Sequence, residues 1–248
     1  MGMIELSYAG DTFSAYVAEP VGEVRGGIVV IHEIWGLVEH IRGIADRYAA
    51  QGYLAIAPDI LSWAGVDPDV GLELNHLMFS ASEEDRALAQ PRLRAALAPT
   101  ASPDYAAWAI GALRAAVDVL AVAPGVDGRI GVLGYCFGGS YSFALAAADA
   151  RVKVAVPYYG SPPEGAAVES IRVPVLAFYG EEDERLMQSL PEVTKRLHDA
   201  GVRFTAQVYP DAGHAFFNDT NRVMYRPAVA ADAWTRTLSF LEESLREV

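Results

Sequence analysis

The pentapeptide Gly134-Tyr135-Cys136-Phe137-Gly138 places the only cysteine of the chain between two glycines. Residues 129–133, which precede it, are apolar and β-prone, and residues 139–148, which follow it, are rich in Ala, Ser and Leu. This pattern predicts a buried strand, a very tight turn and a helix, with glycines where side chains have no room. A lone cysteine in an apolar stretch is usually inert core. Between two glycines, at the start of a helix, we interpret Cys136 as a nucleophile.

A cysteine nucleophile needs a base, and the base needs a group that orients it. His214 and Asp183 are the candidates, and each falls just after a predicted strand, as Cys136 does. The carboxyl ends of parallel strands meet at one edge of a sheet, so the three side chains are expected together there. Glu181 and Glu182 compete with Asp183 for the orienting role. Three other histidines are predicted to be surface or packing residues: His40, His76 and His198. His32 ends a predicted strand and could lie near the site, but it precedes the nucleophile in the chain, which is the wrong order for the triad.

The loop after the predicted strand 27–32 begins with Glu33 and Ile34. The order nucleophile, acid, histidine is that of the α/β-hydrolase fold, in which this loop supplies one backbone N–H of the oxyanion hole. We therefore predict an oxyanion hole formed by the N–H groups of Ile34 and Phe137. Glu33 is predicted to lie at the mouth of the site, where its carboxylate would oppose ionisation of the cysteine unless it takes the proton itself. A plain surface glutamate is the alternative.

Apolar runs alternate with helical patterns along most of the chain. The predicted strands are 4–8, 13–18, 27–32, 53–57, 129–133, 152–158, 173–178 and 204–209, and the predicted helices are 38–51, 104–121, 139–148, 186–200 and 228–245. Strands that alternate with helices predict an α/β fold, with a mostly parallel central sheet and helices on both faces. We expect one domain over residues 1–248, in which the less regular residues 62–100 are an insertion over the active site.

Composition limits the other classes of function. The chain has 248 residues, 52% of them apolar, which is enough for one large core. A net charge of −13 argues against binding to nucleic acids. A single cysteine excludes an internal disulfide, and the first residues lack the basic region of a signal peptide, so a cytoplasmic location is expected. Charged residues interrupt the Ala-rich helices, so we expect no stretch apolar enough to span a membrane.

These motifs resemble those of the dienelactone hydrolase (carboxymethylenebutenolidase) family of the α/β-hydrolase superfamily, nearly from end to end. The matching segments are 32–36, 53–59, 134–139, 158–160, 180–183, 213–216 and 233–241. The resemblance implies that Cys136, His214 and Asp183 form a triad that opens an enol-lactone to a keto acid, in the bacterial breakdown of aromatic compounds. It also implies that Glu33 accepts the thiol proton when the substrate binds.

One position departs from the family pattern. The family has an arginine four residues after the histidine, where it helps to hold the carboxylate of the substrate, and here this residue is Asn218. A second family arginine comes from the insertion, where Arg86 is the favoured candidate and Arg92 and Arg94 are alternatives. An amide is a poor substitute for a bidentate guanidinium contact. A promiscuous thiol carboxylesterase or lactonase that acts on neutral esters is therefore the alternative function.

The expected partner is a small lactone or ester. Trp35 and Tyr135 are predicted substrate contacts, because aromatic side chains near the site suit a flat apolar ligand, although aromatic residues also fill cores. The chemistry requires no metal and no organic cofactor. We expect a monomer or a small homo-oligomer. A non-catalytic ligand sensor is a third interpretation, against which an intact triad argues.

Overall fold

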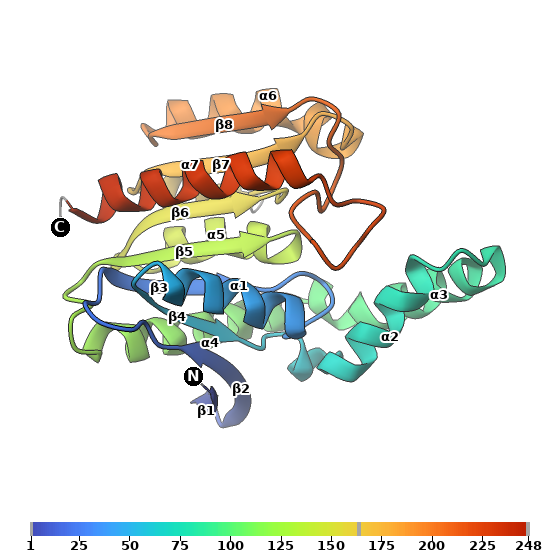
Figure 1. The fold of residues 1–248 in the computed structure, drawn as a ribbon, viewed down its shortest axis with the longest axis horizontal. Helices are drawn as coiled ribbons and strands as arrows, with labels where there is room; N and C mark the ends of the chain where they lie inside the picture. Colours follow the sequence, from blue (N-terminus) through green and yellow to red (C-terminus); the bar gives the residue numbers. More distant parts are fainter. Residues whose placement is uncertain (1, 163–164, 247–248) are drawn as a thin grey trace.

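The computed structural model describes residues 2–162 and 165–246, and within them eight strands form one sheet in the order β1-β2-β4-β3-β5-β6-β7-β8 (Figure 1). The strands are β1 (Gly2–Tyr8), β2 (Asp11–Ala18), β3 (Gly26–Ile31), β4 (Tyr53–Pro58), β5 (Ile130–Tyr135), β6 (Val152–Tyr158), β7 (Val175–Gly180) and β8 (Phe204–Tyr209). β1 pairs with β2 and β2 with β4 in antiparallel fashion, and the other neighbours are parallel. The predicted α/β fold with a mostly parallel sheet is confirmed.

Helices cover both faces of the sheet. They are α1 (Glu39–Ala50), α2 (Pro68–Met78), α3 (Glu83–Leu97), α4 (Pro103–Val122), α5 (Phe137–Ala148), α6 (Glu184–Asp199) and α7 (Pro227–Arg246), with short 3-10 turns η1 (Ser62–Ala64), η2 (Ala98–Ala101) and η3 (Gly165–Ser170). α1 and α7 lie on the near face in Figure 1, and α4, α5 and α6 lie behind the sheet. Because both faces are covered, every residue of β3, β5 and β7 is buried, as their continuous apolar sequences require.

Residues 62–100 form two helices beyond the carboxyl ends of the parallel strands, at the right of Figure 1. Asp67 caps α2 through its side chain, and Ser82 caps α3 in the same way. α2 and α3 pack mainly against each other. The predicted insertion therefore has regular structure, and it stands at the edge of the sheet where the sequence places the reactive residues.

The expectation that no helix is long and apolar enough to cross a membrane is wrong for α4. This helix has 20 residues and few charges, and its composition alone would allow it to span a bilayer. In the fold it lies against β1, β3, β4 and β5, and half of its most apolar window is buried. In this fold α4 is therefore a core helix, and its apolar residues pack against the sheet.

Candidate active site

Cys136 occupies the turn between β5 and α5 with φ 56° and ψ −113°, a conformation that side-chain-bearing residues rarely adopt. A Cβ on Gly134 would lie 1.8 Å from the carbonyl oxygen of Gly138, and a Cβ on Gly138 would lie 2.2 Å from that of Ile31. The two glycines thus allow the helix to start directly against the strands. The predicted tight turn is present, and it leaves the thiol partly exposed at the carboxyl edge of the sheet.

The structure brings Cys136, His214 and Asp183 into one hydrogen-bonded chain. His214 Nε2 lies 3.0 Å from Cys136 Sγ, and His214 Nδ1 lies 2.6 Å from Asp183 Oδ2. Asp183 also caps α6, because its other oxygen accepts the N–H of Leu186. The carboxylate is nearly buried, with a side chain that is 8% exposed, whereas the imidazole is 32% exposed. A fixed carboxylate below and an accessible ring above suit proton transfer at the thiol.

The electrostatics of this chain favour a charged imidazole. Burial lowers the pKa of His214, but the hydrogen bonds and charges of Asp183 and Cys136 outweigh burial and raise its pKa to about 10. Burial raises the pKa of Asp183, but the interaction with His214 outweighs that effect and leaves it below its ordinary value. The ring can therefore hold a proton beside the sulfur at neutral pH.

Glu33 follows β3 and is buried, with 2% of its surface exposed. Its two carboxylate oxygens accept hydrogen bonds from different neutral donors, the hydroxyl of Tyr159 at 3.3 Å and the amide of Asn218 at 2.6 Å. Asn218 Oδ1 accepts from the N–H and the hydroxyl of Thr220, which fixes the Asn218 amide group with its NH₂ toward Glu33. The surface alternative for Glu33 is thus wrong.

Asp219, the residue after Asn218, holds the loop that carries Asn218 in place. Asp219 accepts a hydrogen bond from Arg47 at 3.0 Å and lies 3.1 Å from His40 Nδ1, and both partners belong to α1. These contacts tie the segment after His214 to the first helix of the fold. Asn218 is therefore held beside Glu33, at the position where the dienelactone hydrolase pattern has an arginine.

The two predicted oxyanion donors lie at the start of adjacent segments. Ile34 follows β3, and Phe137 is the first residue of α5. Within the described parts of the chain, neither backbone N–H donates to a backbone or side-chain acceptor. Both groups are free to bind an oxygen atom from a ligand.

A cavity of about 190 Å³ lies over Cys136 and His214. Glu33, Ile34 and Trp35 contribute to its wall, and the insertion contributes Met78, Phe79 and Leu93, completed by Ala215, Asn221 and Met224. None of its described lining residues is arginine or lysine. No sequence signal indicated the residues from the insertion, because their role depends on how α2 and α3 sit over the sheet.

Two predicted substrate contacts lie elsewhere. Tyr135 is fully buried, and its ring stacks on Tyr158 at a centroid distance of 4.6 Å, so the strand directs it into the core. Arg86 is on the exposed side of α3 and donates to the carbonyl of Ser80 at 2.6 Å. Its alternative Arg92 is paired with Glu73. Of the predicted contacts, only Trp35 reaches the cavity.

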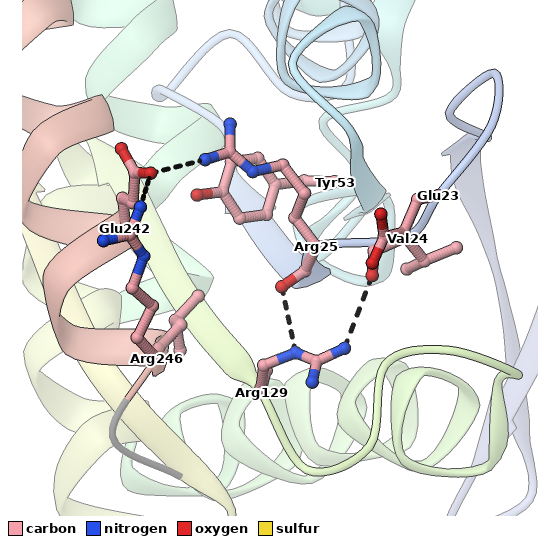
Figure 2. A pocket seen from close by; sticks show the side chains of 8 residues that line it. Glu23, Val24, Arg25, Tyr53, Arg129, Glu242 and Arg246 are labelled. Atoms are coloured by element: carbon pink, nitrogen blue, oxygen red, sulfur yellow. Dashed lines mark hydrogen bonds and ion pairs between the residues drawn. The ribbon is translucent and has the colours of Figure 1, made fainter.

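A cavity of about 520 Å³ lies at the opposite end of the sheet, where β3, β4 and β5 begin (Figure 2). Arg129 donates there to the backbone carbonyls of Arg25 and Val24, and Glu242 lies between Arg25 and Arg246. These arginines are engaged in holding the loop before β3 and the end of α7. Across the described residues, no cluster of three or more His, Cys, Asp or Glu side chains could hold a metal ion.

The profile of the dienelactone hydrolase family matches residues 13–245. This chain belongs to the dienelactone hydrolase family. It is 31% identical to a protein of Escherichia coli K12 named "Putative carboxymethylenebutenolidase", over 98% of this chain and 86% of that one. It is 30% identical to "Protein usf" of Aquifex pyrophilus, over 98% of each chain.

Solved structures agree with this assignment. A crystal structure of a "Putative Dienelactone Hydrolase" from Klebsiella pneumoniae superposes with a TM-score of 0.77 at 29% identity, covering 97% of this chain and 99% of the other. The fold is therefore the α/β-hydrolase fold of the dienelactone hydrolases. As a member of this family, the protein is a hydrolase that acts on esters and lactones.

Proposed function

We propose that this dienelactone hydrolase relative opens enol-lactones and related activated esters through a thioester on Cys136, with His214 as base and Asp183 as its orienting group. The observation that supports this most directly is the continuous chain of contacts from sulfur to imidazole to carboxylate, 3.0 Å and 2.6 Å long. The thiol needs a base to take its proton, and the imidazole that serves as this base needs a carboxylate to orient it.

The reaction begins when the Cys136 thiolate attacks the carbonyl carbon and its double-bonded oxygen becomes an oxyanion. The N–H groups of Ile34 and Phe137, which have no other acceptor in the described chain, bind that oxyanion. When the intermediate collapses, the bond from carbon to the ring oxygen breaks. The oxygen leaves as an enolate, takes the proton of the charged His214 ring and becomes a ketone, while the acyl group stays on sulfur. An enolate is a weak base, so it leaves readily from a thiol adduct.

Acylation changes the proton affinity of His214. Once the sulfur carries the acyl group, its hydrogen bond and negative charge no longer raise the pKa of the imidazole. The neutral ring can then take a proton from water, whose oxygen attacks the thioester carbon. Breakage of the C–S bond releases the carboxylic acid and restores the sulfur. Asp183 holds the ring in one orientation throughout.

We assign to Glu33 the role of first acceptor of the thiol proton. Its buried carboxylate lines the same cavity as Cys136, and both of its oxygens are held by neutral donors. A proton that Glu33 takes from the thiol can pass to the His214 ring, whose pKa Asp183 and the sulfur raise.

A second candidate, a thiol carboxylesterase or lactonase for uncharged substrates, is favoured by the cavity wall. Its apolar side chains offer no arginine or lysine to a substrate carboxylate, and the carboxyl group of Glu33 lies in the same wall. Asn218 stands where the family has an arginine, and its side-chain amide donates a hydrogen bond to Glu33. The chemistry is the same as above, and only the class of preferred substrate differs.

The test of the proposed function uses the Cys136→Ala variant and a neutral activated ester, 4-nitrophenyl acetate, beside an enol-lactone. We expect the variant to lose at least ~10³-fold in kcat/KM, because the nucleophile is absent. Iodoacetamide should inactivate the natural chain with one equivalent of label, since Cys136 is the only cysteine. A variant that hydrolyses either substrate at the natural rate would show that no thioester forms.

A further inference from the structure

His32 lies between the end of β3 and Glu33 and is fully buried. Its Nε2 accepts the backbone N–H of Ile60 at 3.0 Å, and its Nδ1 lies 2.7 Å from the carbonyl oxygen of Glu33. A nitrogen that accepts a hydrogen bond carries no proton, so in the neutral ring the proton is on Nδ1 and is donated to Glu33. Burial lowers the pKa of His32, which keeps the ring in this neutral form.

The carbonyl of Glu33 and the N–H of Ile34 belong to one planar peptide unit. A hydrogen bond that holds the carbonyl therefore also sets the direction of the N–H at the other side of the same plane. The Glu33 oxygen additionally accepts the N–H of Gly36 at 3.2 Å, which closes the turn from the following side. The His32 side chain, together with the Gly36 N–H, thus sets where the Ile34 N–H points.

The same ring contacts the residue that carries the other predicted oxyanion donor. The imidazole of His32 and the ring of Phe137 are nearly parallel, with an interplanar angle of 8° and a centroid distance of 6.3 Å. The backbone beneath them is also close, since Gly138 has no room for a side chain against Ile31. His32 therefore touches both segments that supply the two N–H groups.

We infer that His32 is a positioning residue that aligns the two oxyanion donors, Ile34 N–H through the Glu33 carbonyl and Phe137 N–H through ring contact. The inference rests on the proposed thioester mechanism. His32 takes no proton from the substrate or the thiol, because both of its nitrogens are already engaged with the backbone. Its effect is on the transition state, in which negative charge develops on oxygen.

Two substitutions separate the two hydrogen bonds of the ring. The amide of Asn reaches the place of Nδ1, so His32→Asn retains a donor for the Glu33 carbonyl. The amide of Gln reaches the place of Nε2, so His32→Gln retains an acceptor for Ile60 and loses that donor. We expect kcat/KM for 4-nitrophenyl acetate to fall ~10²-fold in His32→Gln, the size of effect seen when one oxyanion donor is lost, and to fall much less in His32→Asn.

Alkylation of Cys136 by iodoacetamide separates a positioning role from a structural one. This reaction develops no oxyanion, so its rate should be the same in both variants and in the natural chain. Acetaldehyde forms a thiol adduct with an alkoxide-like oxygen, so it should inhibit His32→Gln less strongly than it inhibits the natural chain. The inference is overturned if the two variants hydrolyse equally well, or if alkylation slows in proportion to hydrolysis. Failure of the proposed function looks different, since alkylated natural chain would then still hydrolyse the ester.

Discussion

The contacts of Glu33 distinguish this site at the scale of single residues. A buried carboxyl group is usually balanced by a cation or by several donors, and Glu33 is held by a tyrosine hydroxyl and an asparagine amide. Among the described residues it forms no ion pair. Both donors are neutral, so neither of them brings a positive charge beside this carboxyl group.

The protonation of His214 depends on its two neighbours, and that dependence can be measured. Each neighbour interacts with the charged ring and so raises its pKa, which reaches about 10 when both are present. Removal of a stabilising partner lowers the pKa, so Asp183→Asn and Cys136→Ala should each titrate at lower pH than the natural chain. NMR titration of the His214 ring signals gives the three values directly. Equal values in the three proteins would contradict this account.

At the scale of elements, the turn from β5 to α5 depends on the absence of side chains at two glycines. Gly134 has no positive φ, and its constraint is space alone, since a Cβ would meet the backbone of Gly138 at 1.8 Å. Backbone atoms cannot move aside as a flexible side chain can. The helix that carries the predicted oxyanion donor is thus set against the strand by close backbone contact.

We therefore expect Gly134→Ala to lower the free energy of unfolding by about 3 kcal/mol or more, the upper range for overpacked sites. Gly43→Ala is the matched control, because Gly43 lies inside α1 and a Cβ there would meet no atom within 4 Å. Alanine is the better helix former, so this control should gain about 0.5–1 kcal/mol. Urea denaturation of both variants measures the difference. Similar stabilities for the two would refute the spatial argument.

At the scale of the whole molecule, a net charge of −13 opposes the approach of anions to a cavity whose described lining includes no arginine or lysine. A long-range field and a local contact can both produce a preference for neutral substrates. Salt screens the long-range part over about 10 Å at 0.1 M and affects a contact inside the cavity much less. The two contributions are therefore separable.

Two arginine substitutions on α3 make this separation. Leu93 lines the cavity, whereas Leu88 lies on the same helix with 55% of its surface exposed, and both variants change the net charge equally. Leu93→Arg should raise kcat/KM for a carboxylate-bearing enol-lactone about tenfold relative to its methyl ester, by a charged hydrogen bond. Leu88→Arg should give only a small gain that disappears in high salt. An equal gain in both variants would assign the preference to net charge.

Much of the site was predictable from the sequence because its signals are local. The glycines around Cys136 and the apolar run before it are neighbours in the chain, and a buried parallel strand has the same continuous apolar pattern wherever it occurs. The order of Cys136, Asp183 and His214 after three such strands predicted that they meet at one edge of the sheet. The family resemblance rested on the same short segments.

Tertiary structure alone decided what surrounds the sulfur, and it excluded the glutamates that competed with Asp183 for the imidazole. Asp183 reaches His214 because it is the cap of α6, whereas Glu182 lies 4.0 Å from Arg226. The placement of α2 and α3 brings Leu93 and Phe79 to the cavity, and Asn218 meets Glu33 across 185 positions of chain. Such contacts depend on the packing of distant segments, and no periodicity or spacing within one segment encodes them.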